Sequence, residues 1–125
     1  MKVCYLCGKE NSLTGEHVWS NCVIQAFPSA PFTLDENRGK AYAAPPIVNA
    51  LCNECNHKLS PCDAYMGDLT RTYFTKHLAG DHITLDLVQL FRWILKTSAN
   101  HSVSLKRQNE WWRKYADFMI SGSVR

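Results

Sequence analysis

The stretch "ALCNECNHKLSPCD" at residues 50–63 places three cysteines, two asparagines and a histidine within fourteen positions. Near the N-terminus, Cys4 and Cys7 have the same spacing as Cys52 and Cys55, with two residues between the cysteines of each pair. Two such pairs supply four thiolates, the number that a tetrahedral zinc ion binds in a structural site. The sequence therefore predicts a closed structural zinc site that joins the start of the chain to its middle.

Other interpretations of these cysteines stay open. A redox-active CxxC pair is expected beside a βαβ pattern, which the sequence does not show. An iron–sulfur cluster also binds four cysteines, and the spacing is compatible with one. The two remaining cysteines, Cys22 and Cys62, are expected to pack as small apolar side chains.

Composition predicts one soluble globular domain. The chain has 125 residues, of which 46% are hydrophobic and 20% charged, and its net charge is +3. It contains no run of about 20 apolar residues that would span a membrane, and its first ten residues lack the apolar segment of a signal peptide. We therefore expect no membrane partner and a cytoplasmic location, where cysteines bind metals more often than they form disulfides.

Secondary structure is expected to be irregular in residues 1–62 and helical in residues 63–121, which divides the chain into a core over 1–63 and a helical extension over 64–125. In the first part, "IVNALC" at 47–52 predicts a short strand, and the next eight residues fit a helix of two turns. In the second part, Asp63, Thr84 and Ser104 are expected to cap three helices over 63–78, 85–100 and 105–120. These features predict an α+β fold whose helical extension packs on the zinc-stapled core as a single compact domain.

Helical periodicity also predicts which side chains are buried. In the second helix the apolar residues have i, i+3, i+4, i+7 spacing and are expected to face the core: Leu87, Leu90, Phe91, Ile94 and Leu95. In the third helix Trp111 and Trp112 point about 100° apart, so one is expected in the core while the other contacts a base, a protein partner or a second subunit.

The predicted helices also carry most of the positive charge. Their basic residues are Arg71, Lys76, Arg92, Lys96, Lys106, Arg107, Arg113 and Lys114. Such side chains contact DNA phosphates without reading sequence. An ordinary polar face of amphipathic helices is an equally good explanation of the same pattern.

The motifs together resemble a known family. The series Cys-x-x-Cys-Gly at 4–8, Glu-His-Val at 16–18 and Cys-x-x-Cys-Asn at 52–56 resembles the HNH endonucleases of the His-Me finger, or ββα-metal, group. The similarity is greatest to those members with paired CxxC zinc knuckles, and it covers residues 4–63. The family often has Ile-x-Pro after its histidine, whereas this chain has Val-Trp-Ser at 18–20.

The resemblance implies a role for each of these residues. His17 would be the general base that activates water, and Glu16 and Asn56 would bind a catalytic Mg²⁺ or Mn²⁺ ion. His57 follows Asn56 directly, so either side chain could face that ion. The middle asparagine of the motif falls at Ile47 by position, which leaves Asn49, Asn37 or no residue in that role.

The predicted function is therefore a metal-dependent HNH endonuclease that hydrolyses DNA phosphodiester bonds. The alternative is a catalytically inactive HNH-like zinc protein that acts as an inhibitor or adaptor through protein contacts, for example against a nucleic-acid-processing complex. In both cases Cys4, Cys7, Cys52 and Cys55 would hold the structural zinc.

Overall fold

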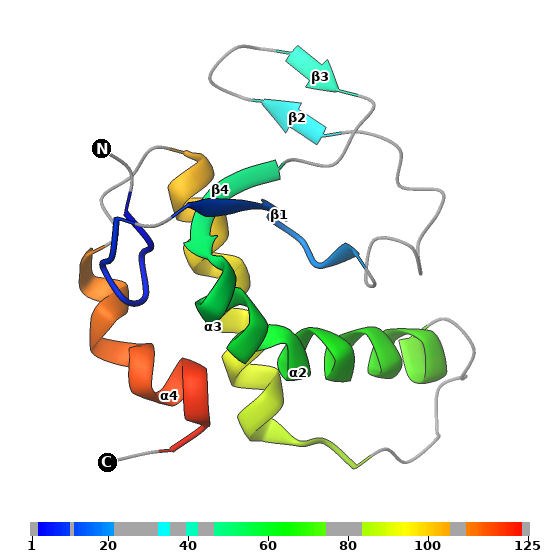
Figure 1. Cartoon of the computed structure of the whole chain (residues 1–125). Coiled ribbons are helices and arrows are strands. Elements are labelled where there is room, and N and C mark those ends of the chain that lie inside the picture. Colours follow the sequence, from blue (N-terminus) through cyan, green and yellow to red (C-terminus); the bar gives the residue numbers. More distant parts are fainter. Residues whose placement is uncertain are drawn as a thin grey trace.

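The computed structural model describes residues 3–10, 12–21, 33–35, 40–42, 47–74, 84–105 and 110–123. The predicted α+β class is confirmed (Figure 1). Strands β1 (Leu13–His17) and β4 (Ile47–Cys52) pair in one antiparallel sheet, and β2 (Thr33–Asp35) and β3 (Lys40–Tyr42) pair in a second. The main helices are α2 (Asn53–Leu69), α3 (Leu87–Ser104) and α4 (Ala116–Ser121). Among the described helices, none is long and apolar enough to cross a membrane.

The register of β1 and β4 sets the direction of the motif side chains. His17 lies opposite Ile47, Glu16 opposite Val48, and Gly15 opposite Asn49. Val48 is buried, whereas Ile47 and Asn49 are exposed. Since side chains alternate between the faces of a strand pair, Glu16 shares the buried face with Val48. His17 therefore shares the other face with Ile47 and Asn49.

Helix α2 begins directly after β4 and is much longer than two turns. Cys52 is its N-cap, with an extended backbone and a sulfur that accepts a hydrogen bond from the Cys55 N–H at 3.5 Å. Pro61 lies inside the helix and cannot donate to the carbonyl four residues earlier, that of His57. The Ser60 hydroxyl donates to this carbonyl at 2.8 Å instead. A local side chain thus compensates for the proline, and the helix continues.

The continuous helix corrects the prediction that Asp63 caps a new one. Asp63 lies in the middle of α2, which runs from Asn53 to Leu69 and continues as a π-helical segment, Thr70–Phe74. Its side chain is bonded to Ser20 and Lys96 rather than to a helix N-terminus. The expected border between core and extension, at 63–64, therefore falls inside one helix.

The predicted cap of the α3 helix was wrong, and its predicted buried face was confirmed only in part. Asp86, not Thr84, is the N-cap, and it accepts a hydrogen bond from the Gln89 N–H at 3.2 Å. Leu90 and Leu95 are half-buried and pack against the core as predicted, whereas Leu87, Phe91 and Ile94 are exposed. The buried residues of this helix are Arg92, Trp93, Lys96, Thr97, Ala99 and Asn100. The buried face is therefore rotated relative to the predicted one, because polar side chains beside the apolar stripe find partners inside the protein.

Arg92 shows how a charged side chain can occupy the interior. It is only 6% exposed, and its guanidinium donates to the carbonyls of Met119 at 2.6 Å, Ile120 at 2.8 Å and Lys58 at 3.1 Å. It also donates to the Gln89 side chain at 2.9 Å. Two of these carbonyls belong to the last turn of α4, where no intrahelical donor is available. Arg92 therefore joins α2, α3 and α4.

The C-terminal region is also more broken than the sequence predicts. Ser104 does not cap a new helix, because it ends α3 and its hydroxyl donates to the His101 carbonyl at 2.6 Å. A 3₁₀ segment, Glu110–Tyr115, leads into the short α4. Gly122 ends α4 as expected, with a left-handed backbone (φ 74°) and an N–H that donates to Phe118 O at 2.7 Å.

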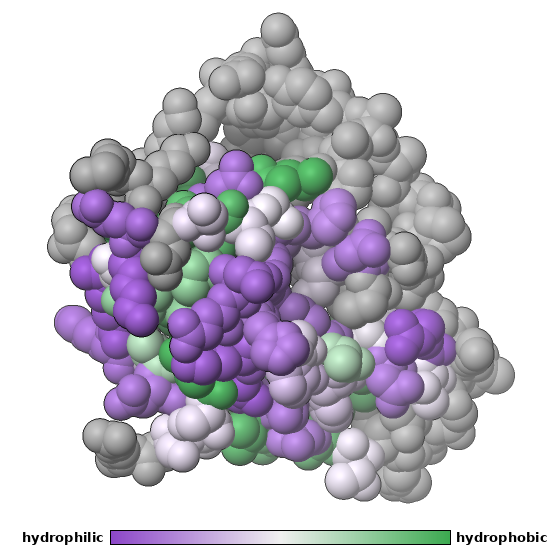
Figure 2. All heavy atoms as spheres, viewed as in Figure 1, coloured by the Kyte–Doolittle hydropathy of each residue, from purple (hydrophilic) through white to green (hydrophobic). Residues whose placement is uncertain are grey.

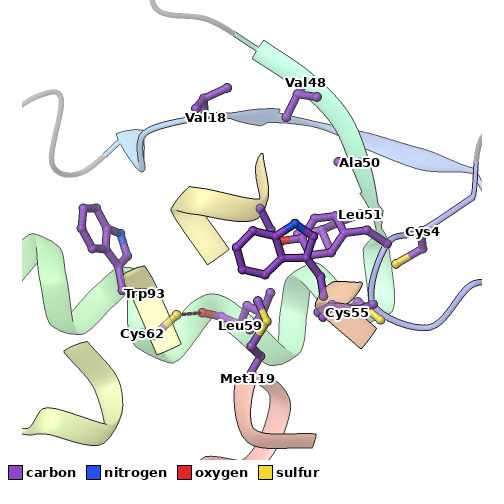
Figure 3. Close-up of a cluster of buried hydrophobic side chains, with 14 of the residues drawn as sticks. Cys4, Val18, Val48, Ala50, Leu51, Cys55, Leu59, Cys62, Trp93 and Met119 are labelled. Carbon is purple, nitrogen blue, oxygen red and sulfur yellow. Dashed lines mark hydrogen bonds between the residues drawn. The ribbon is translucent and has the colours of Figure 1, made fainter. Parts of the chain in front are cut away.

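The core lies between the β1–β4 sheet and the three helices, as Figure 3 shows. The sheet side and its flanks contribute Val18, Val48, Ala50 and Leu51, and the helices contribute Leu59, Cys62, Trp93 and Met119. Trp112 is buried, as predicted for one of the two adjacent tryptophans, and the side chain of Trp111 lies outside the described part. Hydrophilic residues predominate among the coloured atoms of the face in Figure 2.

The burial of Arg92 and the exposure of Phe91 on α3 lead to a prediction about stability. Arg92→Met should lower the free energy of unfolding by about 2–4 kcal/mol, because several buried carbonyls lose their donor. Phe91→Ser, next to it but 51% exposed, should change it by no more than about 0.5 kcal/mol. Urea unfolding of the two variants measures both values. An equal or larger loss for Phe91→Ser would show that the apolar stripe faces the core after all.

Candidate metal centre and the Glu16–His17 site

The first cysteine pair lies in a tight knuckle that is tied to the sheet. The Gly8 N–H donates to the Cys4 carbonyl at 2.8 Å, and the Cys4 N–H donates to the Lys9 carbonyl at 3.1 Å. Gly8 has φ 74°, a left-handed conformation that glycine adopts without a steric penalty. The Tyr5 N–H donates to the Ala50 carbonyl at 3.1 Å. This last bond holds the knuckle against β4, two residues before the second cysteine pair.

The four predicted cysteines come together. The sulfur atoms of Cys4, Cys7, Cys52 and Cys55 all lie within 4.8 Å of one another, and the Cys7–Cys52 sulfur distance is 3.9 Å. A tetrahedral zinc ion with Zn–S bonds of about 2.3 Å would separate its sulfurs by about 3.8 Å. The cluster therefore has the composition and size that could hold a metal such as zinc.

The electrostatics of the cluster indicates how a bound cation would stabilise the four cysteines as thiolates. Burial raises the pKa of Cys7 and, more strongly, that of Cys55. Burial also acts to raise the pKa of Cys52, but hydrogen bonds from Cys55 and the neighbouring thiols outweigh it and lower this pKa. Deprotonation of one thiol thus opposes that of the others. A bound divalent metal ion removes this opposition, because it neutralises the thiolates together.

Cys62 behaves as the sequence predicts for a cysteine outside the pairs. It is fully buried, and its S–H donates to the Leu59 carbonyl at 3.0 Å. Burial raises its pKa to about 11. Cys62 is therefore a small, unreactive core side chain. Cys22 lies outside the described residues.

Glu16 forms an ion pair with a lysine from the helical extension. The Lys96 ammonium lies 3.3 Å from a Glu16 carboxylate oxygen and also donates to Asp63 of α2. The side chains are 3% exposed for Lys96 and 13% for Glu16. Strand β1, helix α2 and helix α3 thus each contribute one charged group to this buried cluster.

The charge of Lys96 is held in place by its two partners. Burial alone lowers the pKa of Lys96, but the carboxylates of Asp63 and Glu16 raise it, and its pKa is above the ordinary value. The ammonium form is therefore favoured at neutral pH even though the side chain is buried. A buried charge of this kind is stable only while its partners stay in place.

Two further side chains extend this buried cluster. The Ser20 hydroxyl donates to Asp63, and the Trp93 indole N–H donates to the Ser20 oxygen at 2.7 Å. The Trp93 ring packs against that of Trp19 with a centroid distance of 6.0 Å and a tilt of 52°. Trp19 is 49% exposed. An indole two residues after His17 is therefore held at the surface in a fixed orientation.

His17 lies at the end of β1 and is half-buried. Its Nδ1 atom is enclosed and has no hydrogen-bond partner within the described part of the chain. Asn49 is on the same face of the sheet, and its side-chain oxygen would lie 3.5 Å from a Cβ atom placed at Gly15. Of the two asparagines considered for the middle position, Asn49 thus projects over Gly15, on the face of the sheet that His17 also occupies. Asn37 lies outside the described residues.

The structure does not bring all the predicted catalytic residues together. Asn56 is half-buried in the first turn of α2, and His57 is exposed. Among the described residues, the four cysteines form the sole group of three or more histidine, cysteine or acidic side chains close enough to hold an ion. His57 therefore does not join Glu16 and His17 in such a group. A catalytic ion between Glu16 and Asn56 stays a prediction.

The burial of Arg92 and Lys96 corrects their expected role in contacting phosphate. Both side chains are buried and have partners inside the protein. Arg71, Arg113 and Lys114 are exposed. Lys76, Lys106 and Arg107 lie outside the described residues.

Sequence reasoning did not identify Ser20, Trp93 and Lys96 as parts of the site. One signal was present, because Arg92, Lys96 and Asn100 recur every fourth residue and form a polar line along one helix. Such a line is normally the solvent side of a helix. Only the partners in distant segments, carboxylates for Lys96 and backbone carbonyls for Arg92, show that this line is buried.

Comparisons of the chain with known protein families, with curated proteins and with solved structures find no match.

The cysteine geometry predicts metal content and its loss. The purified protein should contain about one zinc per chain, and Cys4→Ser or Cys55→Ser should lose the metal and unfold the N-terminal half, because a structural ion contributes folding energy directly. Elemental analysis and circular dichroism measure the two effects. Cys62→Ser is the matched control, since it changes a buried cysteine outside the cluster and should retain the metal. A folded wild-type protein free of metal would contradict the assignment.

Proposed function

We propose that this chain is a zinc-stapled, metal-dependent endonuclease of the HNH type that hydrolyses DNA phosphodiester bonds. The observation that carries the proposal is the position of Glu16 and His17 at the end of β1, within a strand–strand–helix unit that the cysteine cluster ties together. The order β1, β4, α2 supports it, since the resemblance implies two strands followed by a helix. Zinc is the metal proposed for the four cysteines, in a structural role.

Each residue of the proposed site has a task that suits its chemistry. His17 would accept a proton from the attacking water, a task for which an imidazole near neutral pH is suited. Asn49, on the same face, would orient the imidazole. Glu16 and the Asn56 amide would supply oxygen ligands to Mg²⁺ or Mn²⁺. The ion, when bound, would stabilise the charge that develops on the phosphate and the leaving oxygen.

The structure offers one test of whether Glu16 suits a cation. Its carboxylate is largely enclosed and already accepts a positive group, the Lys96 ammonium, at 3.3 Å. A second acidic group, Asp63, faces the same ammonium. Oxygen donors that hold a compact cation have the chemistry that a hard divalent ion needs. Glu16 therefore fits the proposed role, provided that it exchanges one cation for the other.

The surface beside His17 supports contact with nucleic acid. The Trp19 indole packs against the Trp93 ring and is half-exposed, and Ile47 is exposed opposite His17. Stacking of a base on such a ring contributes about 1–3 kcal/mol and tolerates any sequence. The exposed Arg113 and Lys114 could add phosphate contacts. These features suit binding that depends little on sequence.

A second candidate function has its own support. Leu87, Phe91 and Ile94 form an exposed apolar row on α3, and Glu16 is neutralised within the protein. Both features suit a catalytically inactive module that binds another protein. The two candidates differ in the importance of His17, which a nuclease requires and a binder does not.

The nuclease proposal predicts metal-dependent DNA cleavage that is lost with His17. Zinc-loaded protein should nick and linearise plasmid with Mg²⁺ or Mn²⁺ and not with EDTA. His17→Ala should slow the reaction by roughly 100-fold or more, because a general base contributes about 10²–10⁴ in rate. His101→Ala, which changes an exposed histidine on α3, should cleave at the wild-type rate. Gel analysis of the plasmid forms measures cleavage in each of these reactions.

The result decides between the two candidates. Cleavage by wild type and by His101→Ala, but not by His17→Ala, would support the endonuclease with His17 as its base. Failure of folded, zinc-loaded protein to cleave with any metal would overturn the nuclease and leave the protein-binding module.

A further inference from the structure

We infer that Lys96 is a positioning residue that acts as the built-in counter-ion of Glu16 and competes with the divalent metal ion for this carboxylate. The inference rests on the proposed function and adds a regulatory element to the same site. In the metal-free protein the lysine holds Glu16 in place, and a metal ion must displace its ammonium from the carboxylate. Lys96 thereby sets the ion concentration at which the site becomes loaded.

The geometry carries the first step of this inference. The Lys96 ammonium is 3.3 Å from Glu16, and at 3% exposure it is almost fully removed from water. Two unit charges at this distance interact far more strongly in the interior than at the surface. A second cation that approaches Glu16 is therefore repelled by the ammonium unless the ammonium withdraws.

The second step is that the ammonium has another partner to retain. Lys96 also donates to Asp63, which is fixed in turn by the Ser20 hydroxyl and lies in the middle of α2. A small movement of the ammonium away from Glu16 that keeps its contact with Asp63 would release Glu16 without leaving the lysine charge unpaired. Asp63 thus makes the exchange of cations feasible, because Lys96 does not have to leave the interior.

The third step concerns the part of the fold to which Lys96 belongs. Lys96 belongs to α3, outside the segment 4–63 that carries the family resemblance. Helix α3 is held against α2 and α4 by Arg92, one turn before Lys96. The helical extension therefore does more than cover the core, since it supplies the charge that controls Glu16.

A surface ion pair of the same chemistry provides a matched control. Lys58 lies 3.2 Å from Glu54 on the exposed side of α2. Substitution of Lys58 by methionine removes the same charge from a lysine–glutamate pair that is open to water. It should not affect a cation at Glu16, because exposed charges are screened.

The test is a Mn²⁺ titration of zinc-loaded protein, with free Mn²⁺ followed by its paramagnetic resonance signal. Lys96→Met and Lys96→Gln should each bind Mn²⁺ at least about tenfold more tightly than wild type, a coupling typical of two ligands that compete. Lys58→Met should bind as wild type does. Adding Glu16→Gln to Lys96→Met should abolish the gain. Zinc content and circular dichroism identify the variants that are folded.

Asp63→Asn provides an independent measurement that does not require removal of the lysine. With its second partner weakened, the ammonium should stay on Glu16, and Mn²⁺ binding should become weaker than in wild type. Tighter Mn²⁺ binding by this variant, or wild-type affinity in folded Lys96→Met or Lys96→Gln, would overturn the role of Lys96.

Plasmid cleavage measured beside the titrations separates this inference from the proposed function. Cleavage without any effect of Lys96 on Mn²⁺ affinity would refute the counter-ion role and leave the nuclease. Tighter Mn²⁺ binding by the Lys96 variants without cleavage by any protein would support the counter-ion role and refute the nuclease.

Discussion

The convergence of four sulfur atoms within 4.8 Å is the constraint on which the rest of the structure depends. It fixes the first knuckle, the end of β4 and the start of α2 at one point. Cys52 belongs to all three features, since it ends the strand, contributes a sulfur to the cluster and caps the helix through that sulfur. The directions of β1 and α2, and hence the position of Glu16 relative to Asp63, follow from this point.

The second constraint is the burial of charge on α3. Arg92 and Lys96 are neighbours on one face, one turn apart, and both are enclosed. Arg92 satisfies helix-end carbonyls, whereas Lys96 satisfies carboxylates from two other elements. Removing a partner from such a group lowers the free energy of unfolding, because the remaining charge or dipole is buried without a hydrogen-bond partner. The polar face of α3 therefore fixes how the helices are arranged more specifically than an apolar face of equal area would.

The difference between local sequence signals and contacts between distant residues explains which features could be predicted from sequence. The cysteine spacing predicted the cluster, and "IVNALC" predicted a strand with the bounds observed for β4. These signals are local, since each depends on a few adjacent residues. The length of α2 was missed because Pro61 and Asp63 both indicate a boundary locally. Ser60 removes the cost of the proline, and the partners of Asp63 lie 43 and 33 residues away.

Part of the buried face of α3 was missed for the same reason. An amphipathic pattern fixes the period of a helix but indicates its inner side only if polar residues are assumed to face water. Here Lys96 is stabilised by Glu16 and Asp63, and no local pattern links these three positions. The resemblance identified Glu16 and His17 as a pair without indicating that the extension supplies a partner for one of them.

The two proposed cation sites differ in their ligands, and this difference would separate the stability of the fold from the chemistry of the site. The sulfur cluster consists of soft ligands and is closed, so an ion there has no position left for a substrate. Glu16 offers hard oxygen atoms and is bound by a side chain that can exchange partners. Under the proposed function, the fold would depend on the ion at the cysteines and not on the concentration of Mg²⁺ or Mn²⁺. Control by Mg²⁺ or Mn²⁺ would then be confined to the Glu16–His17 end of β1.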